Sequence, residues 1–402
     1  EITLSYFLIM KPFSLAFLLT FALGATAHAG NVVVRPSTAQ SAIDAASSGD
    51  VIRFLPGNYP SITILNKDLS LTNAGQTPAT IGNLEANGSV LTMIGLNAAT
   101  LTVNDLPGKA SSLIVTQGTY GRITTNAAKS RISYCTLNYL VLSGKGIVTG
   151  CEFKGNTSFY SSVSIGGGIG IDLHGANTHA FIHNNQVQNY MLNSNSNMTE
   201  ECIGIRLRDG ANAEIRNNLI SGCKDTLQNG NETDCGMGVF VKSASHATII
   251  GNVIWGCYVD AHGSVIRGDR LVYADAGTVL RYNVLWKNTS EDRHVNPALV
   301  GGGVISADNV SLVHTQDPKF TDSANGDYTL ASDSPAINAG PPDPQYKDRD
   351  GTRNDIGMYG GHSFIPDGRT TKKPIVLSID ASPIAVPTGG TVTIESTGAT
   401  VK

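Results

Sequence analysis

Three runs of the sequence repeat one pattern: Ile169-Gly-Ile-Asp-Leu-His174, Ile203-Gly-Ile-Arg-Leu-Arg208 and Met237-Gly-Val-Phe-Val-Lys242. Each run begins 34 residues after the one before it, and its residues alternate with the period of a β-strand. Later in each unit an Asn stands just before a second apolar run, at Asn185, Asn218, Asn252 and Asn283. Units with two or three strands of a few residues cannot bury their apolar faces alone, so they must stack on one another. The sequence therefore predicts an all-β solenoid, with Asn side chains hydrogen-bonded along its axis at a tight turn.

The composition agrees with this prediction. Of 402 residues, 44 are Gly, 15% are charged and 41% are hydrophobic. These values exclude collagen and a disordered chain, and they indicate many turns and few helical surfaces. The formal net charge is −4 and the isoelectric point is about 6.1. Bulk charge therefore gives no reason to expect a nucleic-acid partner, and we expect a monomer.

The regions that flank the repeat resemble the two ends of a known fold. Residues Gln40–Tyr59 are similar to the N-terminal cap helix and first strand of the pectin-lyase-like superfamily. Segments between Asp317 and Tyr359 are similar to the closing segment of its secreted bacterial members. With the repeat between them, residues 31–361 resemble a right-handed parallel β-helix. The superfamily contains lyases, hydrolases, epimerases and non-catalytic surface proteins, so this resemblance implies a fold and leaves the activity open.

The two ends of the chain predict export and a second module. An apolar run after Lys11 ends at Ala27-His-Ala29, which is typical of a secretory signal peptide and too short to remain in a membrane. We assign residues 1–29 to a signal peptide with upstream residues, 30–365 to the β-helix with its closing segment, and 366–374 to a linker. Residues 375–402 resemble the truncated start of an Ig-like module. These assignments predict a secreted, cell-surface or periplasmic protein, cleaved near Ala29 and with no membrane span after cleavage.

All six cysteines lie in the exported part, where an oxidising compartment permits disulfides: Cys135, Cys151, Cys202, Cys223, Cys235 and Cys257. Cys223 and Cys257 stand 34 residues apart and so share one position of the coil. Disulfides and stacked buried thiols both remain open, while the absence of a C-x-x-C pair argues against a metal site.

The strand pattern also predicts a column of cations on one sheet. Because side chains alternate along a strand, those of Phe240 and Lys242 are expected to point outward. On successive rungs, about 4.8 Å apart, the 34-residue register and an alignment of the Asn positions place His174, Arg208, Lys242 and Tyr273. The companion column contains Asp172, Arg206, Phe240 and Leu271. Like charges stacked so closely oppose folding unless an anion binds them, so we expect an acidic polysaccharide as the partner.

One stretch resembles a particular class of polysaccharide lyase. Residues Val241–Cys257, followed by Val265–Arg270, are similar to a segment of alginate-lyase and chondroitinase-B-type enzymes. In that family the Lys of a Lys-Ser pair is the base and an Arg one coil later donates a proton, which implies these roles for Lys242 and Arg267. This chain departs from the family because the acidic calcium ligands that precede the Lys have no counterpart.

The predicted chemistry is β-elimination on a uronic acid. The enzyme must offset the carboxylate charge, remove the C5 proton and help the O4 leaving group depart. A lysine among cations is a suitable base because neighbouring positive charge disfavours its protonated form. We therefore expect Lys242, Arg267 and Tyr273 as catalytic residues, and His174, Arg206, Arg208 and Arg270 as substrate-binding residues.

Two long connections, Asn189–Glu201 and Lys224–Asp234, recur at one phase of the coil and are expected to wall the same side of the solenoid. Their acids are Glu200, Glu201, Asp225, Glu232 and Asp234. Carboxylates suit Ca²⁺, which is the one cofactor that we expect, and acids exposed to solvent remain the alternative.

The leading hypothesis is a secreted protein that binds an acidic polysaccharide and cleaves it as a lyase. The alternative is a non-catalytic extracellular or surface-attached module for glycan binding or adhesion. A glycoside hydrolase would need a close pair of carboxylates, and Asp172 stands alone in its column.

Overall fold

The computed structural model describes most of the repeat. The described residues are 30–155, 168–192, 202–225, 236–242, 244–259, 268–274, 276–286, 305–307, 309, 311–312, 317–365, 368–371, 373–382, 391 and 393–399. The signal peptide predicted at residues 1–29 lies outside them, so its presence and cleavage stay predictions.

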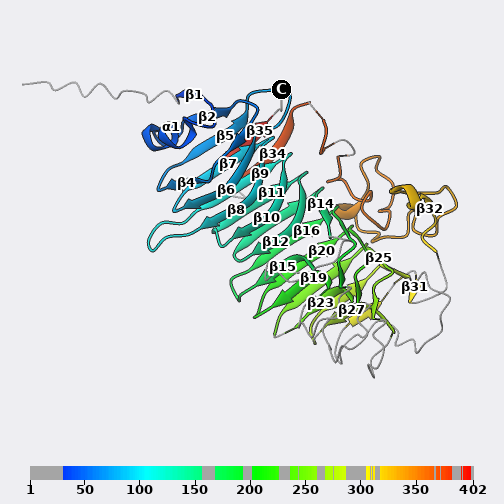
Figure 1. Cartoon of the computed structure of the whole chain (residues 1–402). Coiled ribbons are helices and arrows are strands. Elements are labelled where there is room, and N and C mark those ends of the chain that lie inside the picture. Colours follow the sequence, from blue (N-terminus) through cyan, green and yellow to red (C-terminus); the bar gives the residue numbers. More distant parts are fainter. Residues whose placement is uncertain are drawn as a thin grey trace, which may run out of the picture.

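The chain winds into an elongated stack of coils in which the strands of successive coils lie side by side (Figure 1). One face is a parallel sheet of 12 strands in the order β1 (Asn31–Val34), β2 (Val51–Phe54), β5 (Leu69–Asn73), β7 (Val90–Ile94), β9 (Ser112–Thr116), β11 (Lys129–Ser133), β13 (Lys145–Thr149), β16 (His179–His183), β20 (Asn212–Arg216), β24 (His246–Ile250), β28 (Val279–Arg281) and β30 (Ile305–Ala307).

The other strands of the coils form a second, continuous ladder: β3 (Asn58–Tyr59), β4 (Ile62–Leu65), β6 (Thr80–Asn87), β8 (Asn97–Asn104), β10 (Thr119–Thr125), β12 (Thr136–Leu142), β14 (Glu152–Lys154), β15 (Ile169–His174), β17 (Gln186–Gln188), β18 (Met191–Leu192), β19 (Ile203–Arg208), β21 (Leu219–Ser221), β22 (Lys224–Asp225), β23 (Met237–Val241), β25 (Val253–Trp255), β26 (Tyr258–Val259), β27 (Gly268–Ala274), β29 (Val284–Trp286) and β31 (Ser311–Leu312). Within the described residues its pairings are parallel apart from a short antiparallel contact between β26 and β27. The fold is a parallel β-helix, so the architecture predicted from the repeat is confirmed.

The second ladder changes character along the axis. At β6, β8, β10 and β12 a single long strand crosses it in each coil, and β10 pairs with β12 along most of its length. The first residues of β12 pair with β14 and its last residues pair with β15. From this coil onward, two shorter strands occupy the place of the single long strand. These pairs are β14 and β15, then β17 and β19, then β21 and β23. The long connections are therefore inserted at one place in each coil, just before β15, β19 and β23.

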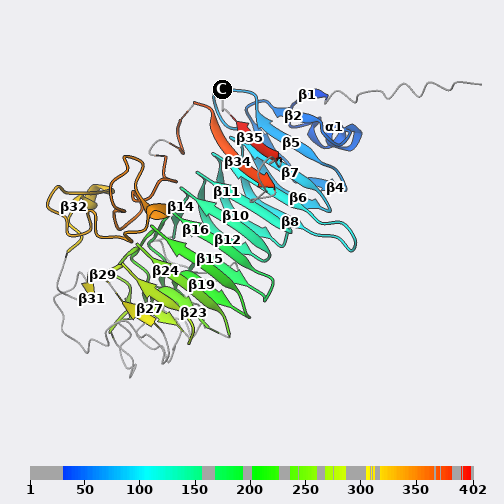
Figure 2. The same ribbon diagram turned by 180° about the vertical axis from the view of Figure 1, so that it is seen from behind.

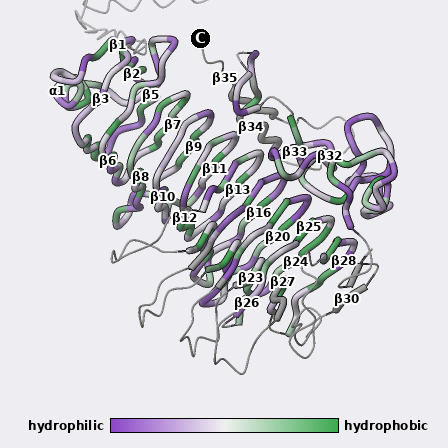
Figure 3. The backbone as a smooth tube through the Cα atoms, turned by 45° about the vertical axis from the view of Figure 1, so that its right-hand side comes forward, coloured by the Kyte–Doolittle hydropathy of each residue, from purple (hydrophilic) through white to green (hydrophobic). Residues whose placement is uncertain are grey.

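The core of the β-helix is built from columns of aliphatic side chains. One such column passes from coil to coil through fully buried residues in register: Ile62, Leu84, Leu101, Ile123, Leu140, Ile171, Ile205, Val239 and Val272. Apolar and polar segments alternate along the coils, as the backbone colouring shows (Figure 3). The helix α1 (Ala39–Ala45) packs Ala39 and Ile43 against the N-terminal end of this core, which confirms the predicted cap helix.

The asparagine ladder predicted from the repeat is present at the turn between the two ladders of strands. The side-chain oxygen of Asn218 accepts hydrogen bonds from the backbone N–H and the side-chain amide of Asn185, both at 3.0 Å. Asn252 and Asn283 continue the same pattern. The left-handed backbone lies one residue earlier, with φ of 57° at Asn184 and 49° at Asn217. The Asn of the ladder therefore forms hydrogen bonds with buried backbone groups, while the residue before it adopts the left-handed conformation of the turn.

The described cysteines are Cys135, Cys151, Cys202, Cys223 and Cys257, and all five are buried free thiols. Burial raises the pKa of the Cys135 and Cys223 thiols well above the ordinary value. The interpretation as stacked thiols in the core therefore holds for these residues, and Cys235 lies outside the described part.

The closing segment folds back along the turns of the β-helix, with β32 (Phe320–Asp322) pairing with β33 (Asp327–Leu330) and with the short helices η1 (Ser323–Asn325) and η2 (Pro344–Tyr346). The Asn184 side chain donates to the Met358 carbonyl at 2.9 Å and to the Gly360 carbonyl at 2.7 Å. Asn217 donates to the Asp355 carbonyl at 2.8 Å. The segment therefore seals the side of the asparagine turns.

The chain ends in an antiparallel pair, β34 (Ile375–Ser382) and β35 (Thr393–Ala399), seen from behind in Figure 2. Gln117 anchors the segment before it by donating to the carbonyls of Gly368 and Thr371 at 2.9 and 2.8 Å. An Ig-like module at this end stays a prediction, because two strands alone do not define one. In the described ranges no helix is long and apolar enough to cross a membrane.

Candidate functional site

The predicted column of cations lies on the face formed by β15, β19 and β23. His174 pairs with Arg208 in the parallel register. Lys242 follows β23 directly, and its backbone N–H donates to the Leu207 carbonyl at 3.0 Å, which continues the ladder by one residue. The structure thus confirms His174, Arg208 and Lys242 on successive rungs.

Glycines place these strands close to the core. A Cβ atom added to Gly204 would lie 2.6 Å from the Gly238 carbonyl oxygen and 2.7 Å from Cγ2 of Ile220. The equivalent atoms on Gly170 and Gly238 would meet backbone and side-chain atoms at similar distances. The second position of each repeated run therefore has no room for a side chain.

The position predicted for Tyr273 is wrong. Tyr273 pairs with Phe240, and so lies in the companion column with Asp172 and Arg206, two residues before the Lys242 position. Leu271, predicted in that column, is buried in the core. The prediction transferred the spacing of the Asn residues to the strands, but the turn after β27 is two residues shorter than the turn after β23, while the strand offset from Phe240 to Tyr273 is 33 residues.

A buried carboxylate joins the two columns. The Arg206 Nε and Nη2 atoms lie 3.0 and 2.9 Å from the two oxygens of Asp172, and the Arg208 Nε and Nη2 atoms lie 3.3 and 3.1 Å from the same pair. The side chain of Asp172 is 1% exposed, that of Arg206 13% and that of Arg208 38%. Burial alone would raise the pKa of the Asp172 carboxyl, but the hydrogen bonds from the two arginines outweigh it and hold the pKa below the ordinary value.

This carboxylate corrects the expectation that an external anion must neutralise the arginines. Asp172 accepts paired hydrogen bonds from both guanidinium groups, the strongest arrangement for such pairs. Asp209 adds a second carboxylate at 2.8 Å from Arg208 Nη1. The stacked arginines are therefore compatible with folding in the absence of a ligand.

Aromatic rings lie on this face on both sides of the arginine pair. The ring centroids of Phe240 and Tyr273 are 5.3 Å apart, and the Lys242 Nζ atom lies 5.5 Å from the Phe240 centroid. On the other side, the Tyr139 hydroxyl lies 3.5 Å from Asp172. Burial, followed by the charge of Asp172, raises the pKa of Tyr139. The face is thus a layer of rings and cations outside the main core.

The exposed polar groups of this face are suited to one kind of chemistry. Lys242 is exposed and Arg208 partly exposed on neighbouring rungs, so a guanidinium of fixed position stands beside an amine. Such a pair can hold a carboxylate and exchange a proton next to it. The carboxylates of Asp172 and Asp209 both engage Arg208, which argues against a glycoside hydrolase pair.

The remaining predicted residues are only partly described. Arg267 lies outside the described residues, and Arg270 is described only as a backbone partner of Met237. The acids predicted to bind calcium also lie outside, except for the backbone of Asp225 in β22. No group of three or more His, Cys, Asp or Glu side chains that could hold a metal ion is found in the part of the chain that the structure describes.

A second charged surface was missed by the sequence reasoning. On the 12-stranded sheet, Lys129 pairs with Lys145 and Lys145 pairs with His179, while Arg131 and Phe181 lie in the neighbouring column. A groove of about 740 Å³ is lined by these residues. The signal was available, because Lys129, Lys145 and His179 are spaced by 16 and 34 residues at the start of three strands, but those strands lack the repeated motif.

Comparisons with known proteins add little to this description. No family model matches the chain, and no curated protein matches it significantly. Among solved structures, the crystal structure of pectate lyase Pel9A is similar, with a TM-score of 0.49 and 15% sequence identity over 82% of this chain and 96% of that one. Nothing about substrate or activity follows from a likeness at this level.

Proposed function

We propose that the protein binds a uronate-containing polysaccharide on the face of β15, β19, β23 and β27, and cleaves it by β-elimination. The observation that carries the proposal is the adjacency of Arg208 and Lys242 on neighbouring rungs, with Arg208 held in place by the buried Asp172. A fixed cation beside an amine meets the two first requirements of the reaction, which are charge compensation and a base.

Each step of the reaction has a candidate group. Arg208 and His174 hold the substrate carboxylate, and Lys242 in its unprotonated form takes the C5 proton. The electrons of the C5–H bond form the C4–C5 double bond, and the C4–O4 bond breaks with its electron pair going to O4. Tyr273 is the described group that can deliver a proton to O4, and Arg267 is the one that the family resemblance implies.

The decisive experiment follows the ultraviolet absorbance of the unsaturated uronate product. The protein is incubated separately with alginate, pectate, chondroitin sulfate and hyaluronan, with Ca²⁺ or with a chelator. A rise on one polymer supports the lyase and names its substrate, and loss of that rise with chelator supports the calcium requirement. Secretion of the protein is part of the same proposal, and the mature N-terminus of the exported protein tests it.

The variant Lys242→Ala separates the proposal from its alternative. A lyase loses cleavage by about 100-fold or more, the usual contribution of a general base, while its affinity changes much less. Lys109→Ala, which removes an exposed lysine from a turn away from this face, is the matched control. A protein that binds the polymers but cleaves none of them is the non-catalytic glycan-binding module.

A further inference from the structure

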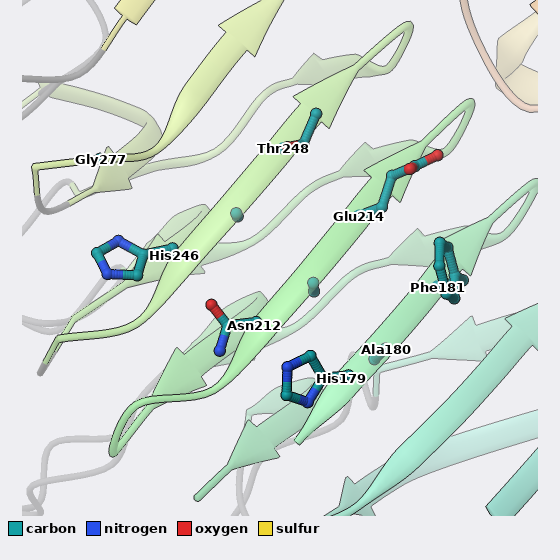
Figure 4. Close-up of a pocket in the computed structure, with 10 residues that line it drawn as sticks. His179, Ala180, Phe181, Asn212, Glu214, His246, Thr248 and Gly277 are labelled. Carbon is teal, nitrogen blue, oxygen red and sulfur yellow. The ribbon is translucent and has the colours of Figure 1, made fainter. Parts of the chain in front are cut away.

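A groove runs over the outer face of the 12-stranded sheet, across β9, β11, β13 and β16. Its volume is about 740 Å³. A smaller hollow of about 260 Å³ continues it over β20 and β24, with His179 and Phe181 shared by both. Figure 4 shows that the side chains of His179, Phe181, Glu214, His246 and Thr248 project from the outer face of these strands. The two hollows together form a path across successive coils.

The first hollow is basic, and its cations have no acidic partner among the residues that the structure describes. Lys129 and Lys145 are exposed and lie opposite each other on neighbouring rungs, which are about 4.8 Å apart. Arg131 stands in the next column, and the groove lining contains no acid. Within the described residues no salt bridge involves any of the three. Positive charges so placed disfavour the folded state until an anion binds them.

The same hollow has an apolar floor. Ile114 and Ile147 line it, and Phe181 is 51% exposed. An exposed aromatic ring beside cations provides a flat surface on which the C–H face of a sugar ring can pack while its acid group is held nearby.

The second hollow differs in charge. Its polar groups are Asn212, Thr248, His179 and His246, together with Glu214, which is paired with Arg216 at 3.0 Å. These groups hydrogen-bond to hydroxyls and amides. Because Glu214 is paired with Arg216, this hollow carries no unpaired cation among its lining residues. A phosphodiester chain carries a charge on every unit, so the lining favours an uncharged sugar over a nucleic acid.

We propose that this groove binds an acidic polysaccharide lengthwise across the coils, as a second site separate from the Lys242 face. An acidic sugar lies against Lys129, Arg131 and Lys145 with its ring on Phe181, and an uncharged sugar occupies the hollow beside Asn212 and Thr248. The site shares its ligand class with the proposed function, but it requires no cleavage. It retains the polymer while the other face acts on it.

The test is a binding titration with hyaluronan, in which acidic and uncharged sugars alternate. Titrations use the full chain carrying Lys242→Ala, so that cleavage does not consume the ligand. Lys129→Ala with Lys145→Ala is expected to weaken binding about five- to thirtyfold, the combined size of two exposed ion pairs, and high salt is expected to shrink that difference. Phe181→Ala is expected to weaken binding several-fold at both salt concentrations.

The matched control removes the same charge elsewhere. Lys109→Ala with Lys347→Ala changes two exposed lysines outside the groove and is expected to bind as the parent does. The inference is overturned if the Lys129 and Lys145 variant binds like this control, or if uncharged dextran binds as well as hyaluronan. It is also overturned if oligothymidylate binds more tightly and depends on the same lysines, or if sedimentation shows that they hold two copies of the chain together.

The titration and the cleavage assay fail independently. If no polymer is cleaved but hyaluronan binding still depends on Lys129 and Lys145, the groove stands and the lyase proposal falls. If cleavage depends on Lys242 while the groove variants bind normally, the lyase proposal stands and the groove falls.

Discussion

Two columns of cations cross the coils of this β-helix, and they differ in how their charge is balanced. On the β15, β19 and β23 face, Arg206 and Arg208 share the buried carboxylate of Asp172. On the 12-stranded sheet, Lys129 and Lys145 face each other in a groove without acids. The two arginines of the first column have a carboxylate partner within the chain. The lysines of the second column have none among the described residues, and the proposed ligand supplies the balancing charge. A row of cations therefore indicates an anion site only where the same and neighbouring rungs supply no carboxylate to pair with them.

The largest effect is expected from Asp172→Asn. The substitution keeps the shape of the side chain but leaves the buried Arg206 without its counter-charge, which costs about 3–5 kcal/mol of unfolding free energy. Urea denaturation of the variant and the parent measures the difference. The double variant Asp172→Asn with Arg206→Met removes the orphaned charge and should recover part of the loss. A cost below about 1 kcal/mol for Asp172→Asn would contradict the internal pairing.

A second effect concerns a third column of the 12-stranded sheet. Burial, with contributions from the nearby cations Arg216, His362 and Arg131, lowers the pKa of His183 to about 4, although a hydrogen bond with Asn184 opposes the shift. The unfolded chain takes up this proton near pH 6.5, so stability is lost progressively as the pH falls from about 6.5 to about 4.

The size of this loss is about 1–3 kcal/mol, allowing for the partial contact of His183 with solvent. Urea midpoints of the parent and of His183→Gln at pH 7 and pH 4.5 measure it. The variant should lose less stability between these two pH values. If both proteins lost the same unfolding free energy between these pH values, His183 would take up its proton as readily in the folded state as in the unfolded chain.

A smaller effect is expected from Arg208→Ala. Asp172 keeps its two hydrogen bonds from Arg206, and Arg208 is partly exposed, so the cost is about 1 kcal/mol. The same variant should weaken any acidic polymer bound on that face. Thermal unfolding and the cleavage assay together separate the two roles, and a cost as large as that of Asp172→Asn would mean that Arg208 is the main partner of the carboxylate.

The sequence predicts the fold well because the repeat is a direct consequence of stacking. Spacings of 34 and 33 residues place Ile171 on Ile205 and Asn185 on Asn218, and these contacts exist because coils of nearly equal length put corresponding positions in register. Tyr273 was misplaced where the coils stop being equal, since two residues are missing from the turn after β27. The spacing between two Asn residues does not show whether a shorter coil has lost residues before or after its strand.

The candidate site was less accessible to sequence reasoning. Asp172 was recognised as the lone acid of its column, but its position between two arginines depends on the diagonal contact from Arg208, which a list of columns does not contain. The sequence did not reveal the second surface, formed by Lys129, Lys145 and Phe181, because their strands share no motif. Their exposure on one face of the sheet is also a property of the folded chain alone.

The smallest effect has the opposite sign to the first and is therefore the most specific. Lys145→Gln removes one of two like charges that lie opposite each other, so unfolding free energy should rise by about 0.2–0.5 kcal/mol at low salt. Screening should abolish this gain at high salt. The loss of unfolding free energy caused by Asp172→Asn should persist at high salt, because the Asp172 side chain is buried. Lys109→Gln, measured in the same urea series, should change nothing at either salt concentration. If Lys145→Gln instead destabilises the protein, Lys145 has a stabilising partner in the folded chain, and the contrast between a completed and an open column disappears.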